Sequence, residues 1–199
     1  MNKALLLSLA LFCCGLQMQA QTMTEDEIMA KLNEASALDN AKKTAEALDA
    51  FLLIGKNMEQ QRTEVEHQIY VYCQAKACMC YETLNRYEEA YLLAKKLIAG
   101  NLTEKEKKDV GHLYAVNGYL YASSFMHGNN RQLVKARTIL EDIMPYADDR
   151  VREYALPKIP LSWYLEGAEY HLSQQYDKAL ACYQNALKGF IELRKTDDE

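Results

Sequence analysis

Histidine, cysteine and paired carboxylates are the residues most able to carry chemistry, and one pair in this chain has a known metal-binding spacing. Glu64 and His67 stand three residues apart, so both side chains lie on one face of a helix, as in carboxylate-bridged di-iron bundles. Such a site needs a second Glu-x-x-His copy and two further carboxylates. The sequence holds no second copy. A solvated helix face is therefore the favoured interpretation of this pair.

The cysteines do not form a recognisable metal or redox motif. Two of the six lie before residue 20, and the others are Cys73, Cys78, Cys80 and Cys182. This spacing matches no zinc pattern, and no histidine pair completes one. All four fall in predicted helices, where buried free thiols behave as small apolar residues. Buried thiols are favoured, and one disulfide bridge stays open as the alternative because an exported chain would meet an oxidising compartment.

No motif in the sequence indicates a catalytic centre. The four histidines, His67, His112, His127 and His171, are scattered, and none adjoins a nucleophile elbow or a glycine-rich phosphate loop. We therefore expect a protein that is not an enzyme and that uses no cofactor or metal. A small metal-dependent or thiol enzyme is the least favoured alternative.

Composition and charge narrow the class of protein further. The chain has 199 residues, 49% hydrophobic and 26% charged, as in an ordinary folded domain. Only 8 glycines and 3 prolines supply turns, which argues against an all-β fold and favours helices. The net charge of -5 offers no basic surface for nucleic acid or for an anionic membrane.

The N-terminal segment is typical of a cleaved secretory signal. Residues 1–20 contain Lys3, an apolar run over residues 4–12 and the small residue Ala20 before Gln21. We expect a single domain over residues 21–199, exported to the periplasm or secreted, with no membrane span. The alternative is a lipid-anchored envelope protein cleaved before Cys14, although bulky Phe12 fits such a site poorly.

A set of aromatic and small residues near the C-terminus has the spacing of a helical repeat: Trp163, Gly167, Tyr170, Tyr176, Ala179, Tyr183 and Ala186. This set resembles the tetratricopeptide repeat, which pairs two antiparallel helices, A and B. Weaker copies lie upstream, and the equivalent alanines Ala47, Ala90, Ala136 and Ala179 are separated by 43, 46 and 43 residues. The resemblance implies an all-α fold, an α-solenoid of about four antiparallel helix-turn-helix hairpins.

Two departures from the repeat and several boundary signals refine this expectation. Glu166 stands where the repeat usually has Leu, and Ile191 stands where it usually has Pro, so the last helix should run on. Thr24 with Glu27 and Thr103 with Glu106 predict capping boxes at the starts of the first and third hairpins. Pro157 and Pro160 interrupt the approach to the last hairpin, so residues 148–155 are expected to form a short separate helix.

The resemblance also implies a function, because A helices of this family line a concave groove that grips peptides. The groove-facing positions carry over to Tyr72, Glu82, His112, Tyr119, Tyr164 and His171. Tyrosine suits such a surface, and the chain has 14 of them. We expect a non-catalytic scaffold or adaptor of the bacterial envelope that binds a protein or peptide. The alternative is that these tyrosines pack between neighbouring hairpins.

The predicted last helix carries more apolar surface than one partner helix needs: Leu180, Tyr183, Leu187, Phe190 and Ile191. Stacked repeats usually end in a polar cap. Three interpretations are open: a homodimer or partner docks on this helix, the residues fold inward against the third hairpin, or the chain is the sensory repeat region of a longer envelope signalling receptor.

Overall fold

The computed structural model describes residues 23–60, 63–128 and 131–197, and all regular secondary structure in these ranges is helical. The predicted signal and Cys14 lie outside them. The helices, in chain order, are α2 (Glu25–Asn40), α3 (Thr44–Asn57), α4 (Glu64–Thr83), α5 (Tyr87–Ile98), α6 (Glu104–Ser124), α7 (Leu133–Ile143), the 3-10 turn η1 (Met144–Tyr146), α8 (Asp149–Ala155), α9 (Lys158–Leu172) and α10 (Tyr176–Asp197).

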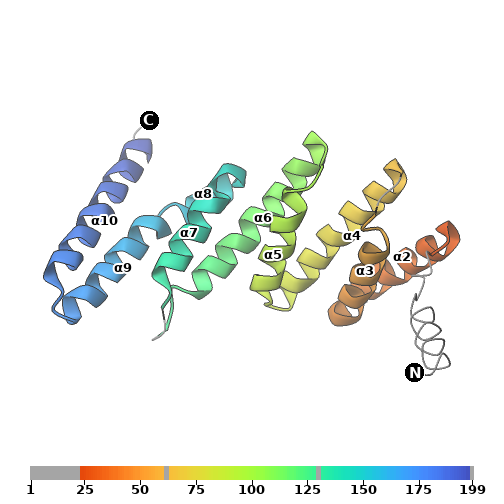
Figure 1. Ribbon diagram of the computed structural model, residues 1–199, viewed down its shortest axis with the longest axis horizontal. Coiled ribbons are helices and arrows are strands. Elements are labelled where there is room, and N and C mark those ends of the chain that lie inside the picture. The colour runs from red at the N-terminus through yellow and green to blue at the C-terminus, as the bar shows by residue number, and fades with distance from the viewer. Residues whose placement is uncertain (1–22, 61–62, 129–130, 198–199) are drawn as a thin grey trace, which may run out of the picture.

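Neighbouring helices pack in a row, which gives an elongated molecule (Figure 1). Three helices each pack between two others: α3 between α2 and α4, α5 between α4 and α6, and α7 between α6 and α9. The last helix, α10, packs on α9 and forms one end of the row (Figure 1). The expectation of an all-helical chain is confirmed.

Capping boxes begin three of the helices, α2, α4 and α6. The two predicted ones are present, since Thr24 and Thr103 each accept the backbone N–H of a glutamate three residues on and the glutamate reciprocates. A third, formed by Thr63 and Glu66 at the start of α4, was not predicted. Each box satisfies backbone donors that the first turn of a helix leaves without partners.

Three connections between paired helices share one backbone geometry. Lys42, Asn85 and Gln174 have φ of 60°, 59° and 60°, and each lies five residues before a repeat alanine. The following residue donates its backbone N–H to a carbonyl five positions back in all three turns, at 2.9 to 3.0 Å. This is the Schellman arrangement that ends a helix. The turn before α7 differs, because its connection is longer.

Small residues lie where the paired helices approach closely. Ala47, Ala90 and Ala136 are fully buried and Ala179 is 2% exposed. A Cβ on Gly167 would lie 2.8 Å from the Tyr183 ring and 3.2 Å from Cys182 Cβ, so no larger residue fits there without movement. Gly167 therefore lies where α9 and α10 approach closely.

The segment between α7 and α9 forms the expected short helix. Asp148 caps α8 by accepting the Val151 backbone N–H at 2.9 Å. Pro157 lies at the N-cap of α9 and Pro160 in its first turn, where a helix needs no N–H donor. The last helix extends to Asp197, as the missing proline predicted. None of the described helices is long and apolar enough to cross a bilayer.

The positive φ of Lys42 yields a stability prediction. Lys42→Gly should raise the free energy of unfolding by roughly 0.5 to 1 kcal/mol, because glycine adopts this conformation without a Cβ penalty. The neighbouring Ala41 has φ of -78°, so Ala41→Gly should lower the free energy of unfolding by a similar amount. Urea unfolding followed by circular dichroism measures both. Destabilisation by Lys42→Gly would contradict the turn geometry.

Candidate interaction surface

The six residues expected to line a groove lie on three helices, α4, α6 and α9. Tyr72 and Tyr164 are 43% and 51% exposed, and His112 and His171 are also exposed. Tyr119 and Glu82 are half-buried. Among the described residues, no hydrogen bond, ion pair or ring contact joins two of the six. The structure therefore places them along a row of helices without gathering them into one cluster.

Tyr72 belongs to an exposed apolar stripe on α4, and it is the one residue of this stripe that was predicted. Val65, Tyr72 and Met79 are all exposed and stand seven residues apart, which puts them on one face of the helix. Tyr72 also meets the Phe51 ring edge-on, with centroids 6.2 Å apart. The seven-residue spacing around Tyr72 was the signal that could have found Val65 and Met79. We call these three residues the α4 stripe.

The predicted positions on α6 are partly covered by the segment that leads into and through α8. His112 Nδ1 lies 3.1 Å from an Asp148 carboxylate oxygen. The Tyr119 ring lies 6.5 Å from that of Tyr154 on α8, and the Lys158 ammonium lies 5.6 Å from the Tyr119 centroid. A peptide that follows the A helices would meet α8 at this point. The inserted helix therefore narrows the predicted groove at its third unit.

On α9 the predicted residues lie close to aromatic neighbours of α10. Tyr164 and Tyr183 have ring centroids 5.7 Å apart, and the His171 ring meets Tyr176 edge-on at 5.5 Å. Both predicted residues keep an exposed side. Leu161 on the same helix is also exposed and was not predicted.

Many of the remaining tyrosines pack between helices. Tyr91 on α5 stacks on Tyr114 of α6 at 5.3 Å, and Tyr121 of α6 lies 5.6 Å from Tyr91. The hydroxyls of Tyr91 and Tyr114 both donate to the Asp142 carboxylate on α7, and the Lys95 ammonium donates to it at 2.6 Å. These aromatic rings fill the core while their hydroxyls reach a carboxylate at its edge.

The Asp142 network shifts two pKa values in opposite directions. Desolvation acts to raise the pKa of Asp142, but the hydrogen bonds from Lys95, Tyr114 and Tyr91 outweigh it, so the pKa lies below its ordinary value. Burial and the hydrogen bond to Asp142 raise the pKa of Tyr114. Asp142 therefore stays charged and Tyr114 stays neutral near pH 7, which fits a structural network with no proton to exchange.

Glu166, the departure from the repeat, has a partner that explains it. Arg137 of α7 donates to Glu166 at 2.9 Å and to the Ser162 hydroxyl at 3.2 Å. Its guanidinium carbon lies 3.3 Å from the Trp163 ring centroid. Both members of the pair are largely buried, at 7% and 15% side-chain exposure. The carboxylate at 166 therefore compensates a buried arginine between α7 and α9.

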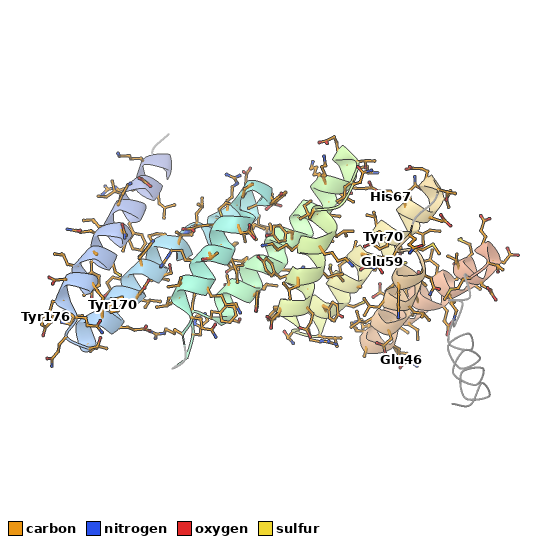
Figure 2. All side chains as sticks on the ribbon, in the orientation of Figure 1. Glu46, Glu59, His67, Tyr70, Tyr170 and Tyr176 are labelled. Atoms are coloured by element: carbon orange, nitrogen blue, oxygen red, sulfur yellow. The ribbon has the colours of Figure 1, made fainter. Side chains whose placement is uncertain are left out.

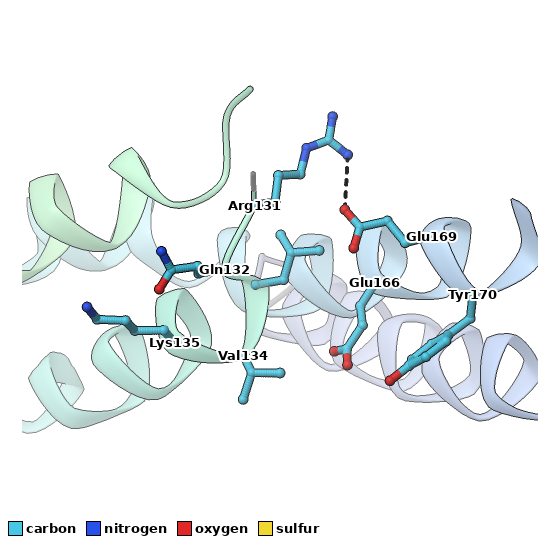
Figure 3. A pocket seen from close by; sticks show the side chains of 8 residues that line it. Arg131, Gln132, Val134, Lys135, Glu166, Glu169 and Tyr170 are labelled. Atoms are coloured by element: carbon cyan, nitrogen blue, oxygen red, sulfur yellow. Dashed lines mark ion pairs between the residues drawn. The ribbon is translucent and has the colours of Figure 1, made fainter. Parts of the chain in front are cut away.

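The hollow between the start of α7 and α9 has a volume of about 510 Å³ (Figure 3). Arg131 and Lys135 supply its positive charges, and Glu166 and Glu169 supply its negative ones. Arg131 lies 3.7 Å from Glu169, the pair drawn in Figure 3. The lining thus carries two positive and two negative side chains, so its formal charges balance. The hollow therefore lacks the unbalanced charge that would select a small ion.

Glu64 and His67 do not form a metal site with each other. His67 Nε2 lies 3.2 Å from a carboxylate oxygen of Glu106 on α6, while Glu64 accepts a hydrogen bond from Gln68. Over the ranges that the structure describes, no group of three or more histidine, cysteine or acidic side chains is arranged to hold a metal ion. The expected solvated face is wrong for His67, which is half-buried between α4 and α6.

Cys73, Cys78, Cys80 and Cys182 are free and buried, so the alternative of one disulfide among them is wrong. Desolvation raises the pKa of Cys73 and of Cys78 to about 12. The thiolate is the reactive form of cysteine, and burial suppresses it.

We predict that Ellman's reagent at pH 8 reacts with none of these four thiols in the native protein within minutes. In denaturant without reductant, all four should react, because none is bridged. A titration that finds two fewer thiols in denaturant than after reduction would contradict this arrangement.

The Asp142 network yields a pH-dependent prediction. Asp142→Asn should lower the free energy of unfolding at pH 7 by about 1 kcal/mol, because the carboxylate loses charge-assisted hydrogen bonds and is partly exposed. A depressed pKa stabilises the fold above the ordinary value near 3.9, and this contribution is lost as pH falls through the folded pKa.

The stability difference between the wild type and Asp142→Asn should therefore shrink between pH 5 and pH 3. Asp49→Asn, on the exposed face of α3, is the control and should change stability by less than about 0.5 kcal/mol. Chemical unfolding at each pH measures both variants. If the difference in free energy of unfolding between the wild type and Asp142→Asn is the same at pH 3 and pH 7, the carboxylate charge does not cause it.

Comparison of the chain with protein-family models, with curated proteins and with solved structures gave no match. The exposed surfaces of the described chain include the α4 stripe, the aromatic positions on α9 and one side of α10.

Proposed function

We propose that the protein is a non-catalytic scaffold or adaptor, exported to the bacterial envelope, that binds an extended segment of another protein along its A helices. In this proposal α2, α4, α6 and α9 are the A helices of a tetratricopeptide-like α-solenoid with four hairpins, and α3, α5, α7 and α10 are the B helices. Three matching Schellman turns and four buried repeat alanines at equivalent positions support this division.

The observation that carries the binding proposal is the α4 stripe. Val65, Tyr72 and Met79 are exposed apolar residues spaced along one face of an A helix. The B helices α3, α5 and α7 each expose one large aliphatic side chain, namely Leu53, Leu92 and Val134. Single exposed apolar residues are ordinary, whereas a line of them on one face suits a peptide laid along a groove.

The occupant should be apolar at spaced positions and extended, because α8 limits the room beside α6. Lys76 lies on α4 beside this face, but Asp39 of α2 neutralises it at 2.8 Å. A few apolar anchors would therefore supply most of the binding energy, with Tyr72 as the central one.

The test is capture of proteins from envelope extract by immobilised protein, read by quantitative mass spectrometry. The stripe variant replaces Val65, Tyr72 and Met79 with Ser. The matched control replaces the exposed Leu53, Leu92 and Val134 with Ser, which removes a similar apolar area from the B helices. Circular dichroism must show equal helix content in both variants.

We expect one protein to be captured by the wild type and by the control and to be lost with the stripe variant. Loss should exceed about tenfold if two anchors each contribute about 1 kcal/mol or more. Equal capture by all three proteins would overturn the groove assignment.

A further inference from the structure

The exposed fraction of the residue that follows each repeat alanine shows whether another helix covers that side of the helix pair. Leu48, Tyr91 and Arg137 are 2%, 5% and 6% exposed, whereas the equivalent Leu180 on α10 is 58% exposed. Two of the buried residues contact the next helix of the row directly. Tyr91 stacks on α6, and Arg137 bonds to Ser162 and Glu166 of α9. Leu180 occupies the same position with no helix over it in the described chain.

Leu180 is part of an exposed stripe that runs the length of α10. Tyr176, Leu180, Leu187 and Ile191 are all exposed, and their spacing of four, seven and four residues puts them on one side of the helix. Tyr176 lies at the outer edge of the molecule in Figure 2. We call these four residues the α10 stripe. The interpretation that the apolar residues of this helix fold inward against the third hairpin is wrong. These residues are exposed, and it is the opposite side of α10 that packs on α9.

We infer that the α10 stripe is the interface of a symmetric dimer, in which α10 of one copy packs antiparallel on α10 of a second copy of this chain. A two-fold axis level with residue 186 would place Leu180 beside Ile191 of the second copy. Leu187 would then lie close to the axis and meet its own equivalent. The apolar face of each helix covers that of the other, as an isologous interface requires.

Charge favours this arrangement over a parallel one. Asp177, Gln184, Lys188 and Lys195 follow one edge of the stripe, at spacings of seven, four and seven residues. In the antiparallel pair the same edges face each other, so Asp177 meets Lys195 of the second copy and Gln184 meets Lys188. A parallel pair would set this edge against the opposite edge of the second helix, so Asp177 would not meet Lys195. The opposed helix dipoles favour the antiparallel pair as well.

The other end of the molecule does not suit the α10 stripe. The exposed side chains of α2 include four acidic ones, Glu25, Asp26, Glu27 and Glu34, beside one large apolar one, Met29. A head-to-tail contact would bury these carboxylates against Leu180 and Leu187 at a large desolvation cost. A pair formed through α10 instead covers the exposed apolar stripe of both copies.

The area of the α10 face indicates how strongly two copies should associate. A helix of 22 residues is about 33 Å long and about 10 Å wide, so one face covers on the order of 350 Å². A standard interface buries about 800 Å² on each partner, and smaller ones belong to weak complexes. We therefore expect a weak dimer, whose copies dilution should separate.

Sedimentation velocity of the protein as the cell produces it, from about 1 to 300 μM, tests the inference. The wild type should shift from monomer to dimer over this range. Leu180→Glu with Leu187→Glu should stay monomeric at every concentration, since both side chains are exposed and their replacement should not affect folding. Leu92→Glu on α5 is the matched control and should dimerise as the wild type does.

Charge exchange tests the orientation. Asp177→Lys alone and Lys195→Asp alone should each weaken the dimer about threefold to tenfold, and the double exchange should restore it. A wild type that is monomeric at 300 μM would overturn the inference and leave the stripe to a different protein or a further helix. If the variant with both leucine replacements still dimerises, the α10 stripe is not the interface. If the double exchange does not restore the dimer, the antiparallel register is wrong.

Discussion

The close approach of paired helices at the repeat alanines is the constraint on which the rest of the structure depends. Ala47, Ala90, Ala136 and Ala179 are buried on helices that pack against their neighbours, and such small side chains allow close packing. A row of helices built in this way has no single deep centre. Each side chain is covered only by its nearest neighbours, so the side of α10 that faces away from α9 stays exposed in the described chain.

This geometry explains the abundance of tyrosine. A thin row of helices has a narrow interior, so a large side chain that fills the gap between two helices reaches the surface with its far end. Tyrosine fits because its ring is apolar and its hydroxyl can donate at the edge, as Tyr91 and Tyr114 do to Asp142. The same residue type then serves both packing and exposed surface, and composition alone does not separate the two roles.

The polar contacts between α7 and α9 specify how the row of helices continues. Arg137 and Glu166 are buried together beside Trp163, where an aliphatic pair would also fill the space. Removing one member would leave an uncompensated buried charge, so the pair ties α7 to α9 specifically. The fixed position of α9 in turn orients Tyr164 and the start of α10, and hence both candidate interaction surfaces of the C-terminal unit.

Local signals in the sequence were enough to predict the helical class, two capping boxes, the short helix α8 and the extension of α10, because each depends on residues within one or two turns. The resemblance to the tetratricopeptide repeat also placed Tyr72 and Tyr164 on outward faces, and both side chains are exposed. The sequence could not decide which tyrosines are covered, because Tyr119 meets Tyr154 only through the path of α8. Nor could it show that Glu166 pairs with Arg137. Exposure of the α10 stripe was likewise left open. These outcomes depend on contacts between residues distant along the chain, and only the packing of whole helices determines them.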